Sequence, residues 1–295
     1  MRQMELRSPD FIIIGAMKSA TSSLYSWLGS LPGCFMAQPK EVNFFSFDTT
    51  WSNGPTWYSD RFSTAARDAL LGEASVSYTY PEHSAAASQR MAELVPDVRL
   101  IYIVRDPIER LRSHYRHEVQ RSRERRPLLE AISSPGNPYI ETSRYYACLR
   151  PYIDRFPNEQ ICVIRFEDLV GTEHPAWYDV LRFLELPEAP APGTAYNVTA
   201  DNSQWSPLLL WLKEKGMWSF RRVARMPRPI RKIGHRLLMK DGAGYEAKLE
   251  RSQEPIPDDL TVPIWDDISQ LERWMGVSTS LWPRAQEAKV AGGHG

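Results

Sequence analysis

A lysine and a row of hydroxyl side chains follow the first apolar run of the chain. The run Phe11–Ile14 leads into Gly-Ala-Met-Lys, and after Lys18 come Ser19, Thr21, Ser22 and Ser23. A strand that turns into a helix offers free backbone N–H groups and the positive end of the helix dipole. The junction therefore predicts a site for a phosphate or sulfate group. In the simpler alternative, the hydroxyls only cap the helix, which leaves the lysine without a role.

The spacing of this junction differs from the common nucleotide-binding loops. Lys18 follows Gly15 by three residues, and no second glycine precedes it. A Walker A loop needs a glycine, four residues and then Gly-Lys-Ser/Thr, and a dinucleotide fingerprint needs Gly-x-Gly-x-x-Gly. The sequence therefore disfavours an ordinary ATPase or GTPase loop.

A second junction of the same kind carries an arginine. The apolar run Arg99–Val104 leads into Arg105, and Asp106-Pro107-Ile108-Glu109 reads as a helix start, with Ser113 inside the helix. An arginine fork and a hydroxyl together suit a phosphate group. The alternative is an arginine paired with a carboxylate beside a capped helix.

Strands and helices are expected to alternate along the first two thirds of the chain. Apolar patterning predicts strands at 11–14, 70–78, 99–104 and 160–166, and helices at 24–31, 84–94, 107–121, 142–156 and 177–184. Such alternation predicts an α/β fold with a parallel sheet and helices on both faces. Ligands bind such sheets at the carboxyl ends of the strands, where Lys18 and Arg105 both lie.

The remaining chain is predicted to extend the same domain. We expect one domain over 1–295, with an α/β core at about 9–186, a helical and basic extension at about 197–285 and a disordered tail at 286–295. A closing helix is expected around 267–276. The basic segment 221–240 and the run 121–127 either attract an acidic acceptor or form a solvated surface.

The composition limits the class of protein. The 295 residues carry 36 basic and 36 acidic side chains, which gives no general case for nucleic acid as a partner. No secretory signal and no apolar run long enough to span a bilayer is visible. Three cysteines, Cys34, Cys148 and Cys162, are too few and too far apart for a disulfide framework. These features predict a soluble cytoplasmic protein.

Four segments in order resemble a known family. "GAMKSATSSL", "PKEVNFF" at 39–45, "RDPIERLRSHY" and the stretch 143–169 are similar to motifs of the sulfotransferases that use 3′-phosphoadenosine 5′-phosphosulfate (PAPS). The similarity is greatest to the heparan sulfate and other glycosaminoglycan enzymes and to their bacterial relatives, and it covers residues 9–186. It implies a P-loop-like three-layer α/β sandwich and sulfuryl transfer from PAPS to a hydroxyl or amine of a small-molecule or saccharide acceptor.

The resemblance also assigns roles to residues. It places the 5′ end of the cofactor on Lys18, Ser19, Ala20, Thr21, Ser22 and Ser23, with Ala20 acting through its backbone N–H. It places the 3′-phosphate on Arg105 and Ser113. It implies that Lys18 stabilises the leaving group and that Glu41 is the general base. Burial against Phe44 and Phe45 is expected to raise the pKa of Glu41, and Lys40 would oppose this if it points inward.

Residues near the acceptor depart from the family pattern. Animal members often carry His where this chain has Asn43 and Lys where it has Ala74. Lys40, Asn43 and Ser75 are predicted to lie near the acceptor, whose identity, together with O- or N-sulfation, stays open. No Lys-Gly-Arg loop is found near the C-terminus, although basic residues between Lys232 and Lys248 are candidates to replace it.

The sequence leaves two other functions open. A nucleotide kinase on a similar scaffold would need a competent Walker loop and Mg²⁺. A non-catalytic nucleotide- or glycan-binding relative would keep the pocket and lose the chemistry. His114, His117 and Glu118 share a predicted helix but form only half of a metal site, and no metal is expected. The sequence carries no signal for the oligomeric state.

Overall fold

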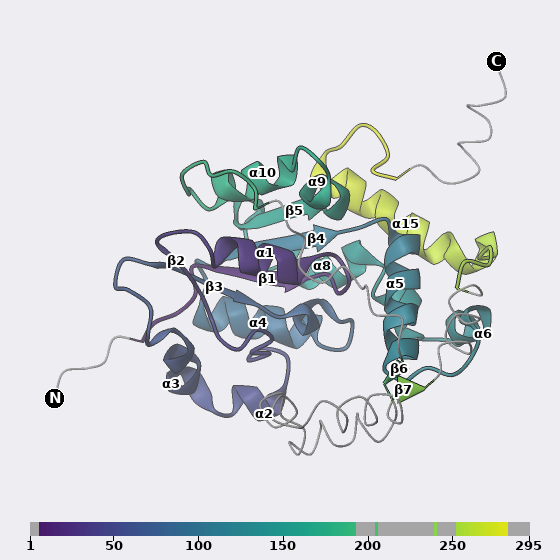
Figure 1. The fold of residues 1–295 in the computed structure, drawn as a ribbon, viewed down its shortest axis with the longest axis horizontal. Helices are drawn as coiled ribbons and strands as arrows, with labels where there is room; N and C mark the ends of the chain where they lie inside the picture. Colours follow the sequence, from purple (N-terminus) through teal and green to yellow (C-terminus); the bar gives the residue numbers. More distant parts are fainter. Residues whose placement is uncertain (1–5, 193–203, 206–238, 241–251, 283–295) are drawn as a thin grey trace, which may run out of the picture. The chain divides into compact units, whose positions relative to one another are not determined.

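The computed structural model describes residues 6–192, 204–205, 239–240 and 252–282 (Figure 1). Five strands form one parallel sheet in the order β2-β3-β1-β4-β5. Their bounds are β1 Phe11–Gly15, β2 Cys34–Met36, β3 Leu70–Ala74, β4 Arg99–Val104 and β5 Ile161–Arg165. The predicted parallel α/β fold is confirmed, and the central position of β1 explains why its run is buried along its whole length.

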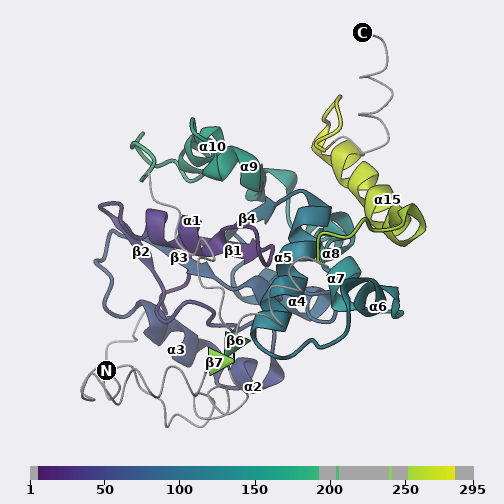
Figure 2. The same ribbon diagram turned by 45° about the vertical axis from the view of Figure 1, so that its right-hand side comes forward.

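Helices connect the strands and flank the sheet (Figures 1 and 2). The described α-helices are α1 Thr21–Leu28, α2 Asp48–Trp51, α3 Gly54–Ser59, α4 Ser84–Leu94, α5 Pro107–Gln120, α6 Leu128–Ser133, α7 Pro138–Glu141, α8 Tyr145–Ile153, α9 Phe166–Val170, α10 Pro175–Phe183 and α15 Asp258–Met275. Three short 3-10 helices are η1 Asp60–Phe62, η2 Val76–Thr79 and η3 Asn158–Gln160. None of these described helices combines the length and the apolar character that crossing a membrane requires.

The two faces of the sheet bury different helices. Phe11 and Ile13 of β1 pack in one cluster with Trp27 of α1 and Trp177 of α10. The two tryptophan rings meet edge to face, with 5.8 Å between their centroids. On the other face, Tyr102 of β4 lies against Tyr145 of α8, at 6.0 Å between ring centroids. The sheet is thus covered on both sides, as its apolar strands require.

Several element bounds differ from the prediction. The expected strand 70–78 ends at Ala74 and continues as η2, and the expected helix 142–156 is the shorter α8. The edge strand β2 was not predicted, because three residues give no periodic pattern. The closing helix α15 begins at Asp258, well before the expected 267, and it contains Pro263.

The chain divides into two compact units. The first comprises 1–110, 141–197 and 262–295, and the second comprises 111–140 and 198–261. In the second unit, Arg112 of α5 is buried and donates to the carbonyls of Ser252 and Glu254, the latter at 2.9 Å. The β6 (Gln204–Trp205) and β7 (Met239–Lys240) pair is antiparallel. The single domain over 1–295 stays a prediction. Most of the extension at 197–285, residues 221–238 of the basic segment and the tail 286–295 lie outside the described residues.

Candidate functional site

The first junction is a tight turn between β1 and α1. A Cβ on Gly15 would lie 2.2 Å from Oγ1 of Thr79, which donates to the Ile14 carbonyl at 3.0 Å, so only glycine fits here. Lys18 and Ala20 then take left-handed backbone angles, with φ of 71° and 63°. Ala20 is the N-cap of α1, and no side chain caps the helix. The hydroxyls of this segment therefore do not serve as the helix cap, contrary to the simpler alternative.

Ser19 supplies the strongest sign of a ligand at this turn. Its side chain is fully buried, and its Oγ has no hydrogen-bond partner in the structure. A buried hydroxyl without a partner is unfavourable, and a bound anion would satisfy it. Thr21 and Ser23 are also buried at the start of α1, and Ser22 is half-buried. The first turn of a helix leaves backbone N–H groups for the same anion. The residues present therefore fit a phosphosulfate group.

The second junction meets the first. Nη1 of Arg105, directly after β4, donates to the backbone carbonyl of Lys18 at 3.3 Å. The Arg105 guanidinium also lies over the ring of Phe166, 4.5 Å from its centroid, and its Nη2 lies 3.9 Å from Oε2 of Glu109. The two cationic side chains thus come from adjacent strands, β1 and β4, as the sheet order requires. The two junctions of the candidate site are therefore in direct contact.

Neighbouring groups fix the backbone around Arg105. The Tyr145 hydroxyl donates to the Arg105 carbonyl at 2.9 Å. Asp106 Oδ1 accepts the N–H groups of Ile108 and Glu109 at 3.0 and 2.8 Å, so Asp106 caps α5 as the sequence predicts. Burial raises the pKa of Asp106, while these two N–H groups oppose the rise. The start of α5 therefore holds Arg105 at a defined place.

Ser113 lies on α5 in the part that belongs to the second unit, where it is half-buried. His114, on the same helix, packs its ring edge to face on Tyr139 at 4.9 Å between ring centroids. Within the described residues, no group of three His, Cys, Asp or Glu side chains forms a metal cluster. The role of Ser113 stays a prediction.

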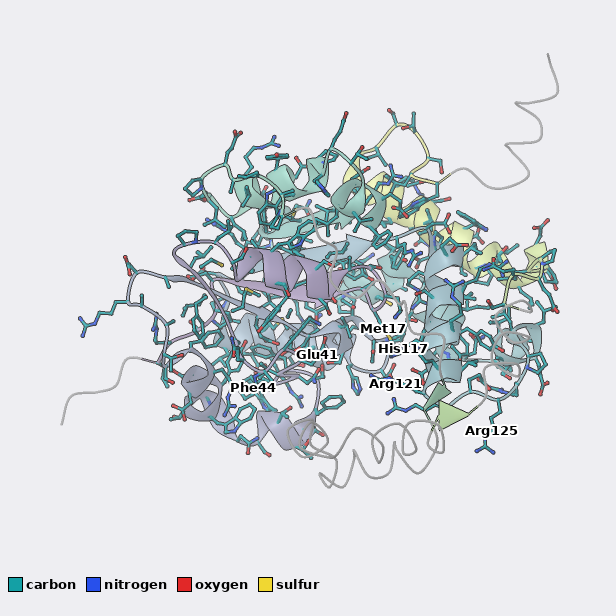
Figure 3. The ribbon with its side chains drawn as sticks, viewed as in Figure 1. Met17, Glu41, Phe44, His117, Arg121 and Arg125 are labelled. Atoms are coloured by element: carbon teal, nitrogen blue, oxygen red, sulfur yellow. The ribbon has the colours of Figure 1, made fainter. Side chains whose placement is uncertain are left out.

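Glu41 lies on the loop after β2, as Figure 3 shows together with Phe44. Its Oε2 accepts the N–H of Val76 at 2.9 Å, and its Oε1 is paired with Nζ of Lys40. The Glu41 side chain is 35% exposed, whereas Phe44 is fully buried and stacks on Tyr58. The expected burial of the carboxylate against the phenylalanines is therefore wrong, because Phe44 turns into the core and Lys40 reaches Glu41.

The residues predicted near the acceptor surround the Glu41 loop. Asn43 donates from Nδ2 to the Glu41 carbonyl at 2.8 Å and accepts from the Ser77 hydroxyl. Ser75 is fully buried, and its hydroxyl accepts the Asn43 N–H at 2.9 Å. Lys40 and Asn43 belong to the loop and are half-buried, whereas Ser75 lies after β3 and supports the loop through its hydrogen bond to Asn43.

Sequence reasoning missed Glu73 of β3. This carboxyl is fully buried and accepts hydroxyls of Tyr58, Ser75 and Tyr78. Burial raises its pKa to about 7 in spite of those hydrogen bonds. The sequence does show a single acidic residue in an apolar strand, which could have marked Glu73 as unusual. It could not show the tyrosines around Glu73, because they come from other elements.

The chain matches a family model described as the Sulfotransferase family over residues 57–190. That range contains Arg105 and Glu73 but begins after Lys18 and Glu41. The match therefore covers β3, β4 and β5 but neither the Lys18 junction nor the Glu41 loop.

Curated relatives extend the similarity to more of the chain. The human bifunctional heparan sulfate N-deacetylase/N-sulfotransferase 3 is 33% identical over 201 residues, which is 60% of this chain and 22% of that protein. The mouse heparan sulfate glucosamine 3-O-sulfotransferase 5 is 27% identical over 191 residues, 61% of this chain and 54% of that protein. The matched region thus spans from about a fifth to about half of the length of these relatives.

A solved structure shares the fold. The sulfotransferase from Alicyclobacillus acidocaldarius superposes with a TM-score of 0.64 at 22% identity, covering 94% of this chain and 100% of that one. The family model and the relatives name the same kind of protein, and the solved structure shares the fold. The chain is therefore similar to sulfotransferases over its α/β core.

Proposed function

We propose that this protein transfers the sulfuryl group of PAPS to a hydroxyl or amine acceptor. The observation that carries the proposal is the contact of Arg105 with the Lys18 carbonyl, beside the buried and unpartnered Ser19 hydroxyl. One nucleotide that carries phosphate groups at both its 5′ and 3′ positions can occupy both junctions, with its 5′ end on the turn before α1 and its 3′-phosphate toward Arg105. A kinase substrate such as ATP lacks the 3′-phosphate.

The proposed reaction is an in-line displacement at sulfur. The acceptor oxygen or nitrogen forms a bond to sulfur while the bond from sulfur to the 5′-phosphate oxygen breaks, which releases adenosine 3′,5′-bisphosphate. Lys18 stabilises the negative charge on the leaving oxygen, and the N–H groups at Ala20 and Thr21 assist it. Glu41 takes the proton of the acceptor. No metal is needed for these steps.

The structure constrains how Glu41 would meet an acceptor. The Val76 N–H holds Oε2, so Oε1 is the oxygen that can turn to a substrate once Lys40 releases it. A hydroxyl would then replace the ammonium group at hydrogen-bond distance. Lys40 would be left to pair with an anionic group of the acceptor.

We further propose a saccharide as the first acceptor class to test, because the similar curated proteins are named for heparan sulfate. Those names include both an N-sulfotransferase and a 3-O-sulfotransferase, so both amine and hydroxyl acceptors belong in the screen. Small-molecule hydroxyls form the second class.

The cysteines support a reducing compartment, and we propose the cytoplasm. Cys34, Cys148 and Cys162 are free thiols. Burial raises the pKa of each to about 12, so none is an activated thiolate.

Calorimetry with three nucleotides tests the proposal. Adenosine 3′,5′-bisphosphate should bind more tightly than ATP and than adenosine 5′-phosphate. Arg105→Ala should weaken binding of the bisphosphate by about tenfold, since a charge-assisted hydrogen bond is worth about 1.5–3 kcal/mol. The affinity for adenosine 5′-phosphate should stay nearly unchanged. Ser113→Ala should act in the same direction if that hydroxyl meets the 3′-phosphate. Equal or tighter binding of ATP would overturn the proposal.

A further inference from the structure

Glu73 places a buried carboxyl group directly behind the loop that carries Glu41. Its side chain is 0% exposed, near the end of β3. Hydroxyls of Tyr58 and Ser75 donate to it at 2.8 and 2.5 Å, and the Tyr78 hydroxyl lies 2.9 and 3.0 Å from its two oxygens. A buried carboxylate is costly unless it is paired or fully hydrogen-bonded. Such a group in a sheet otherwise lined by apolar residues calls for an explanation beyond stability.

The hydrogen bonds of Glu73 lead to the Glu41 loop through one residue. Ser75 donates its hydroxyl to Glu73 and accepts the backbone N–H of Asn43 on the same oxygen, at 2.9 Å. The residues on either side of Ser75 complete the attachment. The Glu41 N–H donates to the Ala74 carbonyl at 3.0 Å, and the Val76 N–H donates to Glu41 Oε2 at 2.9 Å.

The loop needs such support because its backbone is strained. Glu41 and Asn43 both have left-handed angles, with φ of 63° and 54°. Residues other than glycine persist there only where surrounding contacts determine the conformation. The bonds to Ala74, Ser75 and Val76 are among those contacts, together with the hydroxyls of Ser77 and Thr50, which donate to Asn43. The Ser75 hydroxyl in turn depends on Glu73 for its orientation.

We propose that Glu73 is a positioning residue, which acts through Ser75 to hold the Glu41 carboxylate in its working orientation. The inference rests on the proposed function, because it presumes that Glu41 is the base. Glu73 itself does not touch the acceptor, since it is fully buried and Ser75 stands between it and the loop. The ionised Glu73 carboxylate accepts a hydrogen bond from the Ser75 hydroxyl. This polarises the hydroxyl and strengthens the hydrogen bond that its oxygen accepts from the Asn43 N–H.

The protonation state of Glu73 should matter to this role. Burial raises the pKa of Glu73 to about 7, and the charge of Glu41 adds to the rise. The other titratable groups that face it are Tyr58 of α3, Tyr78 of η2 and Tyr152 of α8. The ionised form accepts three hydroxyl bonds, whereas the neutral form must donate one. Protonation should therefore loosen the link to Asn43.

Three variants test the inference: Glu73→Gln, Ser75→Ala and the control Glu82→Gln, which alters an exposed glutamate. Hydrogen exchange is measured by mass spectrometry on the peptide that covers Lys40–Ser46. Transfer is measured from labelled PAPS to desulfated heparan sulfate between pH 6 and 9. We expect about tenfold faster exchange in the loop for Glu73→Gln and Ser75→Ala, and no change for Glu82→Gln.

The kinetic readout separates positioning from mere stability. Glu73→Gln should lower kcat by about 10- to 100-fold, leave the KM for PAPS within about twofold, and remove an inflection near neutral pH from the turnover profile. A structural role alone would lower the melting temperature but leave kcat per folded molecule and the pH profile unchanged. That result, or unaltered loop exchange, would overturn the inference.

Two provisions keep the test independent of the proposed function. Hydrogen exchange requires no acceptor, so it reports on the Glu41 loop even if desulfated heparan sulfate is not a substrate. Failure of the proposed function would instead appear in the unaltered protein, as a lack of preference for adenosine 3′,5′-bisphosphate. If Glu73→Gln does not fold, Ser75→Ala keeps the carboxylate, breaks the same link and must give the same loop exchange.

Discussion

At the scale of single residues, the proposed role of Glu41 as base makes a kinetic prediction. Glu41→Gln keeps the size of the side chain and its acceptor for the Val76 N–H, but it cannot take a proton. We expect turnover to fall by about 10²–10⁴-fold, the usual contribution of a general base, with bisphosphate affinity unchanged. Radiolabel transfer and calorimetry measure the two quantities. Turnover equal to that of the unaltered protein would remove Glu41 from this role.

Phe166 offers a second prediction at this scale, because its ring lies 4.5 Å beneath the Arg105 guanidinium. Phe166→Leu keeps an apolar side chain but removes the aromatic face that orients the arginine. We expect bisphosphate binding to weaken by about two- to fivefold, the value of an exposed cation–π contact. Phe183→Leu on α10 is the matched control, since Phe183 packs against the apolar cluster. Equal effects of both changes on calorimetric affinity would indicate general destabilisation.

At the scale of elements, the start of α5 carries the next prediction. Asp106 accepts two backbone N–H groups of the first turn and directly follows Arg105. Asp106→Ala should lower the free energy of unfolding by about 1 kcal/mol, as the loss of an N-cap does. It should also weaken bisphosphate binding, because the helix start holds the arginine. Urea unfolding and calorimetry measure both, and Asp97→Ala, which changes an exposed aspartate, is the control.

The elements that the sequence predicted well have strong local signals. β4 and α4 have the expected bounds, and the Asp106-Pro107 pair marks the start of α5. The elements that were missed have weak signals. β2 has only three residues, and Pro263 argues against a helix in the first half of α15. The two junctions were likewise visible as local patterns. The surroundings of Glu41 and Glu73 were not, because the partners of Glu73 come from α3, η2 and the residue after β3. Such contacts depend on topology rather than on periodicity.

At the scale of the whole molecule, the first unit is built from three separate stretches of chain. Its last stretch returns through α15, where Asp267 is 2% exposed and accepts the N–H groups of Tyr146 and Ala147 at 2.7 and 2.9 Å. These groups belong to the first turn of α8, whose own N-cap provides no side-chain bond. A helix distant in sequence thus caps α8, and Tyr145 beside it holds the Arg105 backbone. The C-terminal stretch is therefore part of what fixes the site.

This arrangement makes stability depend on pH in a defined direction. Burial raises the pKa of Asp267 to about 6, from a usual value of 3.8. The folded protein thus binds the proton more tightly than the unfolded chain, so this group's stabilisation is complete below pH 4 and is lost as pH rises through 6. Asp267→Asn removes the titration. The excess stability of the unaltered protein over this variant should therefore shrink by up to about 3 kcal/mol between pH 4 and 7. Urea unfolding at each pH measures the free energy of unfolding, and Asp266→Asn, which changes an exposed aspartate, is the control. If the difference in unfolding free energy between the unaltered protein and Asp267→Asn stays constant with pH, Asp267 has the same pKa in the folded and unfolded states.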